Sequence, residues 1–281
     1  MVSQEQRRRQ LAREKFLRQQ QRRTVARRKT RTRNAAIASA LAVVIIGSLA
    51  LYTTGVLKGD DDSKSNANAE VTPSATSKAP DPCEKPAAGK VKTATWKKEP
   101  ELTIDKSAKY AMKLATTCGD IDIALKASAA PHTVNSFAFL AGKGFFDHSK
   151  CHRLVDSSIY VLQCGDPQGT GMGGPGYTIP DENLKDTSLK DNVYPAGTVA
   201  MANQYNAQTK EGRDSGGSQF FLVYQDSQLP PDYTPFGTVS EAGMKVLKKI
   251  AAAGAQPADP TTGNTAPNAT VVINKATVTK S

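Results

Sequence analysis

The sequence has few of the side chains that bind metals or attack substrates. It contains three histidines and four cysteines in 281 residues. The cysteines form no Cys-x-x-Cys pair, and no group of cysteines and histidines has the spacing of a zinc site. The serines and thiols also lack an evident base with a third group to orient it. We therefore expect no metal, no cofactor and no hydrolytic chemistry.

The folded part of the chain also lacks an excess of positive charge. The net charge is +11, and residues 1–33 hold eleven arginines and two lysines against two glutamates, so the remainder is neutral. A neutral remainder offers no basic surface for nucleic acid, which we exclude as a partner. The basic tail is expected to be cytoplasmic and to contact anionic lipid.

Residues 34–57 contain no charged side chain. A helix of this length spans roughly 36 Å, enough for a hydrocarbon core of about 30 Å. The basic tail on one side predicts a single-pass signal anchor in the cell membrane, with the N-terminus cytoplasmic and residues 58–281 outside. A cleaved signal peptide is the alternative, which the long basic segment and the long apolar stretch disfavour.

The remainder divides into a linker and a folded domain. Residues 58–101 are polar and rich in small residues, which predicts a disordered linker before a domain at 102–281. Strands are predicted at 110–116, 119–125, 151–155, 159–164, 197–203, 218–224 and 270–274. Helical spacing is found at 131–140 and 241–253. Many short strands with two helices predict an antiparallel barrel or sandwich with the helices at its open ends.

The four cysteines allow two disulfides outside the cytoplasm. Cys151 and Cys164 are expected near the open ends of one hairpin, where they could face each other, which would leave Cys83 for Cys118. Buried free thiols are the alternative.

A glycine-rich segment at 169–176 looks superficially like a phosphate-binding loop. Pro175, Tyr177 and Pro180 occur where a helix would have to begin, so no helix N-terminus is available for a phosphate. The segment is predicted to be a surface loop.

Two short stretches carry the chemistry. One contains His152 and Arg153, followed by Gln163 and Cys-Gly-Asp at 164–166; the other is Ser-Gln-Phe-Phe at 218–221. An arginine in an otherwise apolar strand needs a partner, and a glutamine on the paired strand could orient it. Such a set can hold a peptide, polarise one amide and bury an apolar ring, which suits a reaction that breaks no covalent bond.

These stretches resemble the active-site strands of cyclophilins, the peptidyl-prolyl cis-trans isomerases, from about residue 103 to 280. The resemblance implies a mainly β fold: a closed eight-stranded antiparallel barrel capped by two helices. It also implies that Arg153, Gln163 and Phe221 are catalytic. It further implies a set of substrate-binding residues: His152, Tyr160, Val161, Ala202, Asn203, Gln219, Leu229 and Tyr233.

Three departures from the family pattern bear on the site. The turn between Arg153 and Gln163 is two residues longer, which leaves the register around 156–158 open. Tyr233 stands where the family has a histidine. Gln228 stands where a tryptophan often supports cyclosporin binding, so weak inhibition by cyclosporin is expected.

The sequence thus predicts a monomeric enzyme that accelerates Xaa-Pro isomerisation in exported polypeptides. The alternative is a non-catalytic module at the membrane surface that binds proline-containing peptides or acts as a chaperone.

Overall fold

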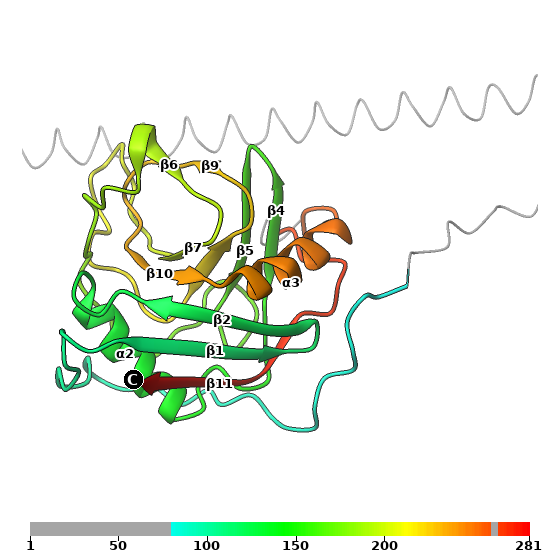
Figure 1. Ribbon diagram of the computed structural model, residues 1–281, viewed down its shortest axis with the longest axis horizontal. Helices are drawn as coiled ribbons and strands as arrows, with labels where there is room; N and C mark the ends of the chain where they lie inside the picture. The colour runs from blue at the N-terminus through cyan, green and yellow to red at the C-terminus, as the bar shows by residue number, and fades with distance from the viewer. Residues whose placement is uncertain (1–79, 260–263) are drawn as a thin grey trace, which may run out of the picture. The chain divides into compact units, whose positions relative to one another are not determined.

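The computed structural model describes residues 80–259 and 264–281, which fall within one compact unit, Ala75–Ser281 (Figure 1). The basic tail predicted at 1–33 and the span predicted at 34–57 lie outside the described residues. Among the helices that the structure describes, none has the length and apolar character needed to cross a membrane.

Nine strands form one sheet in the order β3-β11-β1-β2-β10-β7-β8-β5-β4. Their bounds are β1 Tyr110–Thr116, β2 Gly119–Leu125, β3 Ser149–Lys150, β4 Arg153–Ser157, β5 Ile159–Cys164, β7 Thr198–Met201, β8 Phe220–Val223, β10 Pro235–Val239 and β11 Val272–Lys280. A second sheet pairs β6 (Val193–Tyr194) with β9 (Ser227–Gln228). Strand β6 directly follows a short 3₁₀ helix at Lys190–Asn192.

The predicted elements are largely confirmed. The strands at 110–116, 119–125 and 159–164 have the predicted residues, and the others are present with shifted ends. Strand β10 was missed because it begins at Pro235 and contains Gly237, and both residue types weaken a strand pattern. Gly237 is nevertheless required there, because a Cβ would lie 2.7 Å from a methyl of Ile123.

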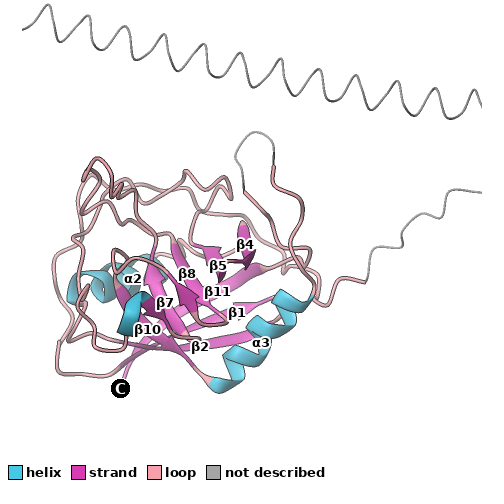
Figure 2. Ribbon diagram, turned by 90° about the horizontal axis from the view of Figure 1, so that it is seen from above, coloured by secondary structure: helices cyan, strands magenta, loops and turns pink. Residues whose placement is uncertain are grey.

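The two helices cover separate parts of the sheet (Figure 2). Helix α2 (Pro131–Gly142) packs against β11, and α3 (Glu241–Ala252) packs against β2. The side chain of Ser240 caps α3 by accepting a hydrogen bond from the amide of Gly243. Both helices therefore cover apolar strand residues that would otherwise face water.

The main core lies between α2 and the inner face of the sheet. Phe137 of α2 is completely buried, and its ring centroid lies 5.2 Å from that of Phe146, 5.4 Å from Phe220 and 4.6 Å from Phe236. This aromatic cluster ties α2 to β8 and β10.

A second apolar cluster, here called the outer apolar cluster, lies on the opposite face of the same strands. It consists of Val161, Tyr194, Ala200, Phe221 and Val223. Side chains alternate between the two faces of a strand, so β5, β7 and β8 are apolar on both sides and support two separate clusters.

The prediction of a closed eight-stranded barrel is wrong. The described residues form an open nine-stranded sheet with β3 and β4 at its edges. These edge strands follow each other in the chain, and the two residues between them change partner: the amide of Cys151 donates to the carbonyl of Val271, and that of His152 to the carbonyl of Gln163. The edge strands β3 and β4 are thus connected along the chain through Cys151 and His152, and they do not pair with each other.

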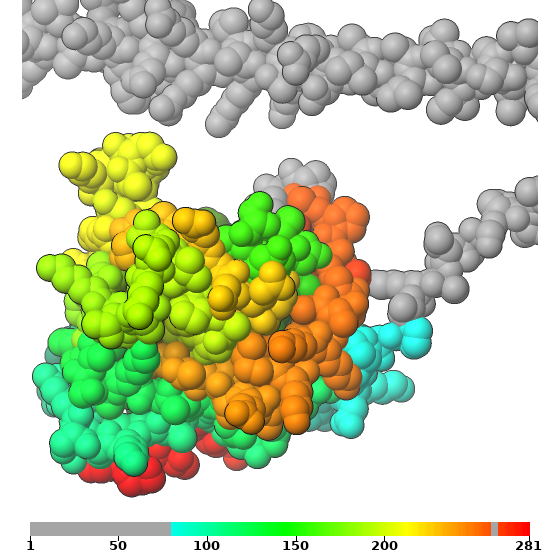
Figure 3. Space-filling view, turned by 45° about the horizontal axis from the view of Figure 1, so that its top comes forward, coloured from blue at the N-terminus to red at the C-terminus, as the bar shows by residue number. Residues whose placement is uncertain are grey.

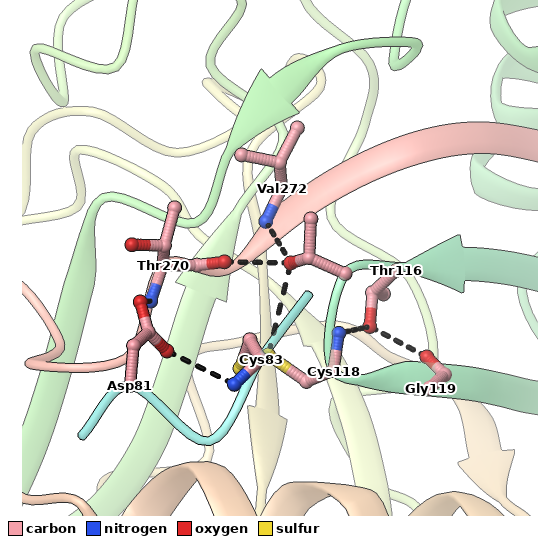
Figure 4. Close-up of a disulfide and its surroundings, with 8 residues drawn as sticks. Asp81, Cys83, Thr116, Cys118, Gly119, Thr270 and Val272 are labelled. Carbon is pink, nitrogen blue, oxygen red and sulfur yellow. Dashed lines mark hydrogen bonds between the residues drawn. A yellow bond between two sulfur atoms is a disulfide. The ribbon is translucent and has the colours of Figure 1, made fainter. Parts of the chain in front are cut away.

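Residues 80–101, the described part of the predicted linker, contain no helix or strand but lie against the domain. A disulfide joins Cys83 to Cys118 in the turn between β1 and β2 (Figure 4). The carboxylate of Asp81 accepts hydrogen bonds from the amides of Cys83 and Thr270. A second disulfide joins Cys151 to Cys164, so the structure has the pairing that the hairpin suggested.

We expect Phe137→Ala to lower the free energy of unfolding by about 3–5 kcal/mol, because it leaves a cavity among three other rings. Urea unfolding measures the change. Leu102, which is 41% exposed, is the control, and Leu102→Ala should stay within about 0.5 kcal/mol of the wild type. Equal losses for both variants would contradict the assignment of the core.

Candidate active site

Arg153 begins β4 and lies half-buried beside the outer apolar cluster. It is paired with Gln163 of β5 in the strand register, and its Nη1 donates a hydrogen bond to Gln163 Oε1 at 3.2 Å. Burial lowers the pKa of the guanidinium, and the nearby Tyr233 acts in the opposite direction. Arginine stays protonated in proteins, so the site holds a positive charge that is partly removed from water.

Gln163 is held in turn by a chain of hydrogen bonds. Its Nε2 donates to Gln219 Oε1 at 2.9 Å, and Gln219 Nε2 donates to the carbonyls of Gly171 at 3.0 Å and Gly173 at 2.9 Å. Because the loop carbonyls can only accept, they fix the orientation of both side-chain amides. The arginine is therefore positioned by a relay that begins in the glycine-rich loop.

A small cavity lined by both apolar and polar side chains lies next to the guanidinium. Its volume is 150 Å³, and it is lined by Arg153, Ile159, Val161, Gln163, Ala202, Asn203, Phe221, Leu229 and Tyr233. The ring of Tyr233 meets that of Phe221 edge-on, with centroids 5.4 Å apart. The cavity places an apolar, ring-lined surface within the same pocket as the arginine.

Tyr194 lies in the outer apolar cluster, with residues that line this cavity, and the sequence did not predict it as part of the site. Its ring is fully buried, and its hydroxyl donates to the carbonyl of Tyr233 at 2.8 Å and accepts from the amide of Tyr233 at 3.2 Å. Burial raises the pKa of the Tyr194 hydroxyl, which keeps it protonated as a donor. No motif marks this residue, because its role depends on β6 packing against the residues that line the cavity.

A larger groove of 620 Å³ adjoins the cavity and shares Gln163, Ala202 and Asn203 with it. Its other walls are residues 171–178, 204, 215 and 217–219. Asn203 is fixed because its Nδ2 donates to the carbonyl of Asp232 at 2.7 Å. The cavity and the groove therefore adjoin each other at these three shared residues.

The loop from 204 to 213 borders the groove and projects from the surface, in yellow in Figure 3. The guanidinium of Arg213 stacks 3.4 Å from the ring centroid of Tyr205 and forms ion pairs with Asp181 and Asp232. These contacts connect three separate loops at the groove's rim.

Two predicted binding residues, Tyr160 and His152, line neither the cavity nor the groove. Tyr160 faces the main core side, where its ring contacts Tyr224 at 5.9 Å, because it alternates with Val161 along β5. Ile159, on the same face as Val161, lines the cavity instead. His152 is buried beneath the glycine-rich loop, and within the described residues neither ring nitrogen has a hydrogen-bond partner. Burial lowers the pKa of His152.

The other predicted residues lie together. Arg153, Gln163, Phe221, Val161, Ala202, Asn203, Leu229 and Tyr233 line the cavity, and Gln219 lines the groove. Gln228 is exposed in β9 beside Leu229. Across the part of the chain that the structure describes, no three His, Cys, Asp or Glu side chains gather to hold a metal ion.

Asp166 organises the glycine-rich loop. Its buried carboxylate accepts hydrogen bonds from the amides of Gln168, Thr170, Gly171 and Gly173. Burial alone would raise the pKa of Asp166, but these hydrogen bonds outweigh it and lower the pKa below its usual value. The loop that orients Gln219 is thus itself built around one carboxylate.

The family match and the sequence relatives indicate one family. The family described as "Cyclophilin type peptidyl-prolyl cis-trans isomerase/CLD" matches residues 111–278. The chain is 46% identical over 195 residues to "Probable peptidyl-prolyl cis-trans isomerase B" of Mycobacterium leprae, covering 66% of this chain and 59% of that protein. It is 38% identical over 155 residues to a "Peptidyl-prolyl cis-trans isomerase" of Helicobacter pylori, covering 54% of this chain and 85% of the relative.

Among solved structures, the chain is similar to a cyclophilin type peptidyl-prolyl cis-trans isomerase of Cryptosporidium parvum. The TM-score is 0.48 at 25% identity, covering 61% of this chain and 98% of that one. The chain spans less than two thirds of the length of the mycobacterial relative.

The lowered pKa of Asp166 predicts a pH-dependent contribution to stability. A carboxyl whose pKa falls on folding stabilises the protein above its unfolded pKa of about 3.9 and loses that contribution as the pH falls through its folded pKa. Asp166→Asn should therefore be less stable than the wild type at pH 7, and the difference should shrink at pH 3. Urea unfolding at both pH values measures this. Asp156→Asn changes an exposed carboxylate and is the control, and a difference for Asp166→Asn that did not change with pH would contradict the assignment.

Proposed function

This chain belongs to the cyclophilin-type peptidyl-prolyl cis-trans isomerase family, and on that premise we propose that it accelerates cis-trans isomerisation of Xaa-Pro bonds in polypeptides. The observation that supports the proposal most directly is the 150 Å³ cavity in which Arg153 adjoins Phe221. It combines an apolar surface suited to a proline ring with a fixed cationic donor.

The chemistry requires the amide bond to twist. Rotation about a peptide bond has a barrier of about 18–20 kcal/mol because the C–N bond has partial double-bond character. In the twisted state conjugation is lost and the prolyl nitrogen regains its lone pair. A donor placed at that nitrogen stabilises the twisted state over both planar states, which is how catalysis by differential binding operates.

Arg153 is the group suited to this role. Its guanidinium is half-buried, so the surroundings weaken its interaction with water and strengthen its hydrogen bond to a bound amide. Gln163 and Gln219 hold the guanidinium in place before the substrate arrives. Lowering the barrier by about 7 kcal/mol would give roughly a 10⁵-fold increase in rate.

The rest of the site holds the peptide. The proline ring would lie against Val161, Phe221 and Leu229, with the edge of Tyr233 closing one side. The flanking chain would follow the groove past Gln163 and the backbone of Ala202 and Asn203. Only the acyl group before the proline then has to rotate.

A non-catalytic peptide-binding module is the second candidate. It is favoured by Tyr233, which stands where the family pattern has a histidine, and by the longer turn after β4, where Ser158 has a φ of +68°. Such a module would use the same cavity and groove to bind proline-containing segments without accelerating exchange.

Arg153→Ala separates the two candidates. We expect the wild-type chain to accelerate cis-trans exchange of an Ala-Pro peptide in NMR exchange spectra, and Arg153→Ala to lose roughly 100-fold or more, as when one preorganised donor is removed. The dissociation constant of the peptide should change far less. Lys150→Ala removes an exposed cation from β3, which precedes β4 in the chain, and should behave as wild type. Binding without acceleration by the wild type would establish the binding module instead.

We also propose that the isomerase acts outside the cytoplasm, on exported chains, while anchored by residues 34–57. The uncharged span behind a strongly basic tail supports this orientation. The two disulfides support it as well, because disulfides persist in oxidising compartments. Contact of the tail with anionic lipid and a monomeric state stay predictions.

The orientation predicts that protease added to intact cells cuts the segment before residue 80 and releases the domain. Immunoblotting of the supernatant with an antibody to residues 102–281 measures the release, and a cytoplasmic protein that stays intact is the control. Protection of the domain until the cells are lysed would contradict the orientation.

A further inference from the structure

The segment 83–103, here called the strap, lies outside the range 111–278 that the family matches, and it contains no helix or strand. It is nevertheless fixed along its length. Its anchors are the disulfide Cys83–Cys118, the hydrogen bond from Ala87 N to Asn274 Oδ1, the pair of Glu99 with His132 Nδ1 at 2.6 Å, and the hydrogen bond from Thr103 N to Asn135 Oδ1.

Trp96 lies in the middle of the strap and connects it to the groove. Its half-buried ring packs on Phe139 and Phe145, with centroid distances of 5.2 Å and 6.0 Å. Its backbone amide donates to the carbonyl of Pro175 at 2.8 Å. The ring therefore anchors a backbone donor against the glycine-rich loop.

The contact between strap and loop is too close for a side chain. Gly176 has a φ of +87°, and a Cβ there would lie 2.8 Å from the carbonyl oxygen of Trp96 and 2.9 Å from Cβ of Thr95. The two backbones thus pack directly on each other at Trp96 and Gly176.

The other side of the same loop faces the groove. Pro175, Gly176 and Tyr177 line the groove together with Gly217, where a Cβ would lie 3.1 Å from Cδ of Pro175. This stretch, residues 175–177, is therefore a thin wall, with the strap behind it and the segment that leads into β8 beside it.

We propose that the strap is part of the peptide-binding machinery and that Trp96 is its positioning residue, holding the wall at 175–177 for the substrate residues that flank the proline. The inference rests on the proposed function only in that the groove receives a peptide. The 150 Å³ cavity contains no residue of this wall. The loop carbonyls that hold Gln219 belong to Gly171 and Gly173, whose amides are fixed by Asp166 and not by the strap. We therefore expect the strap to affect the flanking residues and to leave the proline subsite unchanged.

The test compares two peptides on the full chain and its Trp96→Ala variant. One is a blocked Ala-Pro dipeptide, which fills the cavity alone, and the other is a proline-centred decapeptide, which also occupies the groove. NMR titration gives both dissociation constants. We expect Trp96→Ala to weaken the decapeptide roughly three- to ten-fold, since a loop that is no longer preorganised must be ordered on binding, and to leave the dipeptide unchanged.

Two variants serve as controls. Trp96→Phe keeps a ring on Phe139 and Phe145 and should restore decapeptide binding, while Lys97→Ala alters the exposed neighbour and should have no effect. If Trp96→Ala fails to fold, Trp96→Leu replaces it, because leucine retains apolar packing without the ring.

The possible outcomes are distinct. An equal loss for both peptides would show a general packing role and overturn the proposal, as would unchanged binding of both. A wild type that binds the decapeptide no better than the dipeptide would show that the groove receives no peptide, and would also overturn it. Absence of accelerated exchange in the wild type would refute the isomerase alone, since the binding comparison does not depend on catalysis.

Discussion

The hydrogen bond between Arg153 and Gln163 is the interaction on which the site depends. A guanidinium beside an apolar cluster loses part of its hydration, and it needs a fixed partner to remain in one orientation. Gln163 supplies that partner because the pairing of β4 with β5 places the two residues opposite each other. The polar chain then continues through Gln219 into the glycine-rich loop, so the position of one cation is set by the backbone of a distant segment.

The second constraint is the pleat of the central strands. Strands β5, β7 and β8 are apolar on both faces, with Phe220 directed to the main core and Phe221 to the outer cluster. A shift of one residue in register would exchange these faces and remove the cavity. The Cys151–Cys164 disulfide lies immediately beside the Arg153–Gln163 pair and joins the same part of the chain covalently. The disulfide therefore restrains the ends of β4 and β5 that carry Arg153 and Gln163.

The described domain is larger than the range 111–278 that the family model matches. Residues before 111 supply a disulfide, a tryptophan anchored on two phenylalanines and the outer support of the groove. A glycine-rich wall has few side chains of its own with which to pack, so the segment before residue 111 supplies the packing that the wall lacks. Support from outside offsets the conformational freedom that glycine brings.

The sequence by itself determined the family, the central strands and most of the site, because Arg153, Gln163 and Phe221 occur in dense local motifs with strand alternation. The tertiary structure decided what depends on distant contacts. Tyr194 supports the cavity without any motif, and Ile159 replaces Tyr160 there because the pleat fixes which face each residue takes. The open sheet follows from a change of partner at Cys151 and His152, which no local pattern encodes. The strap looked like a linker because its composition is polar, and its order comes from a disulfide and one aromatic anchor rather than from periodicity.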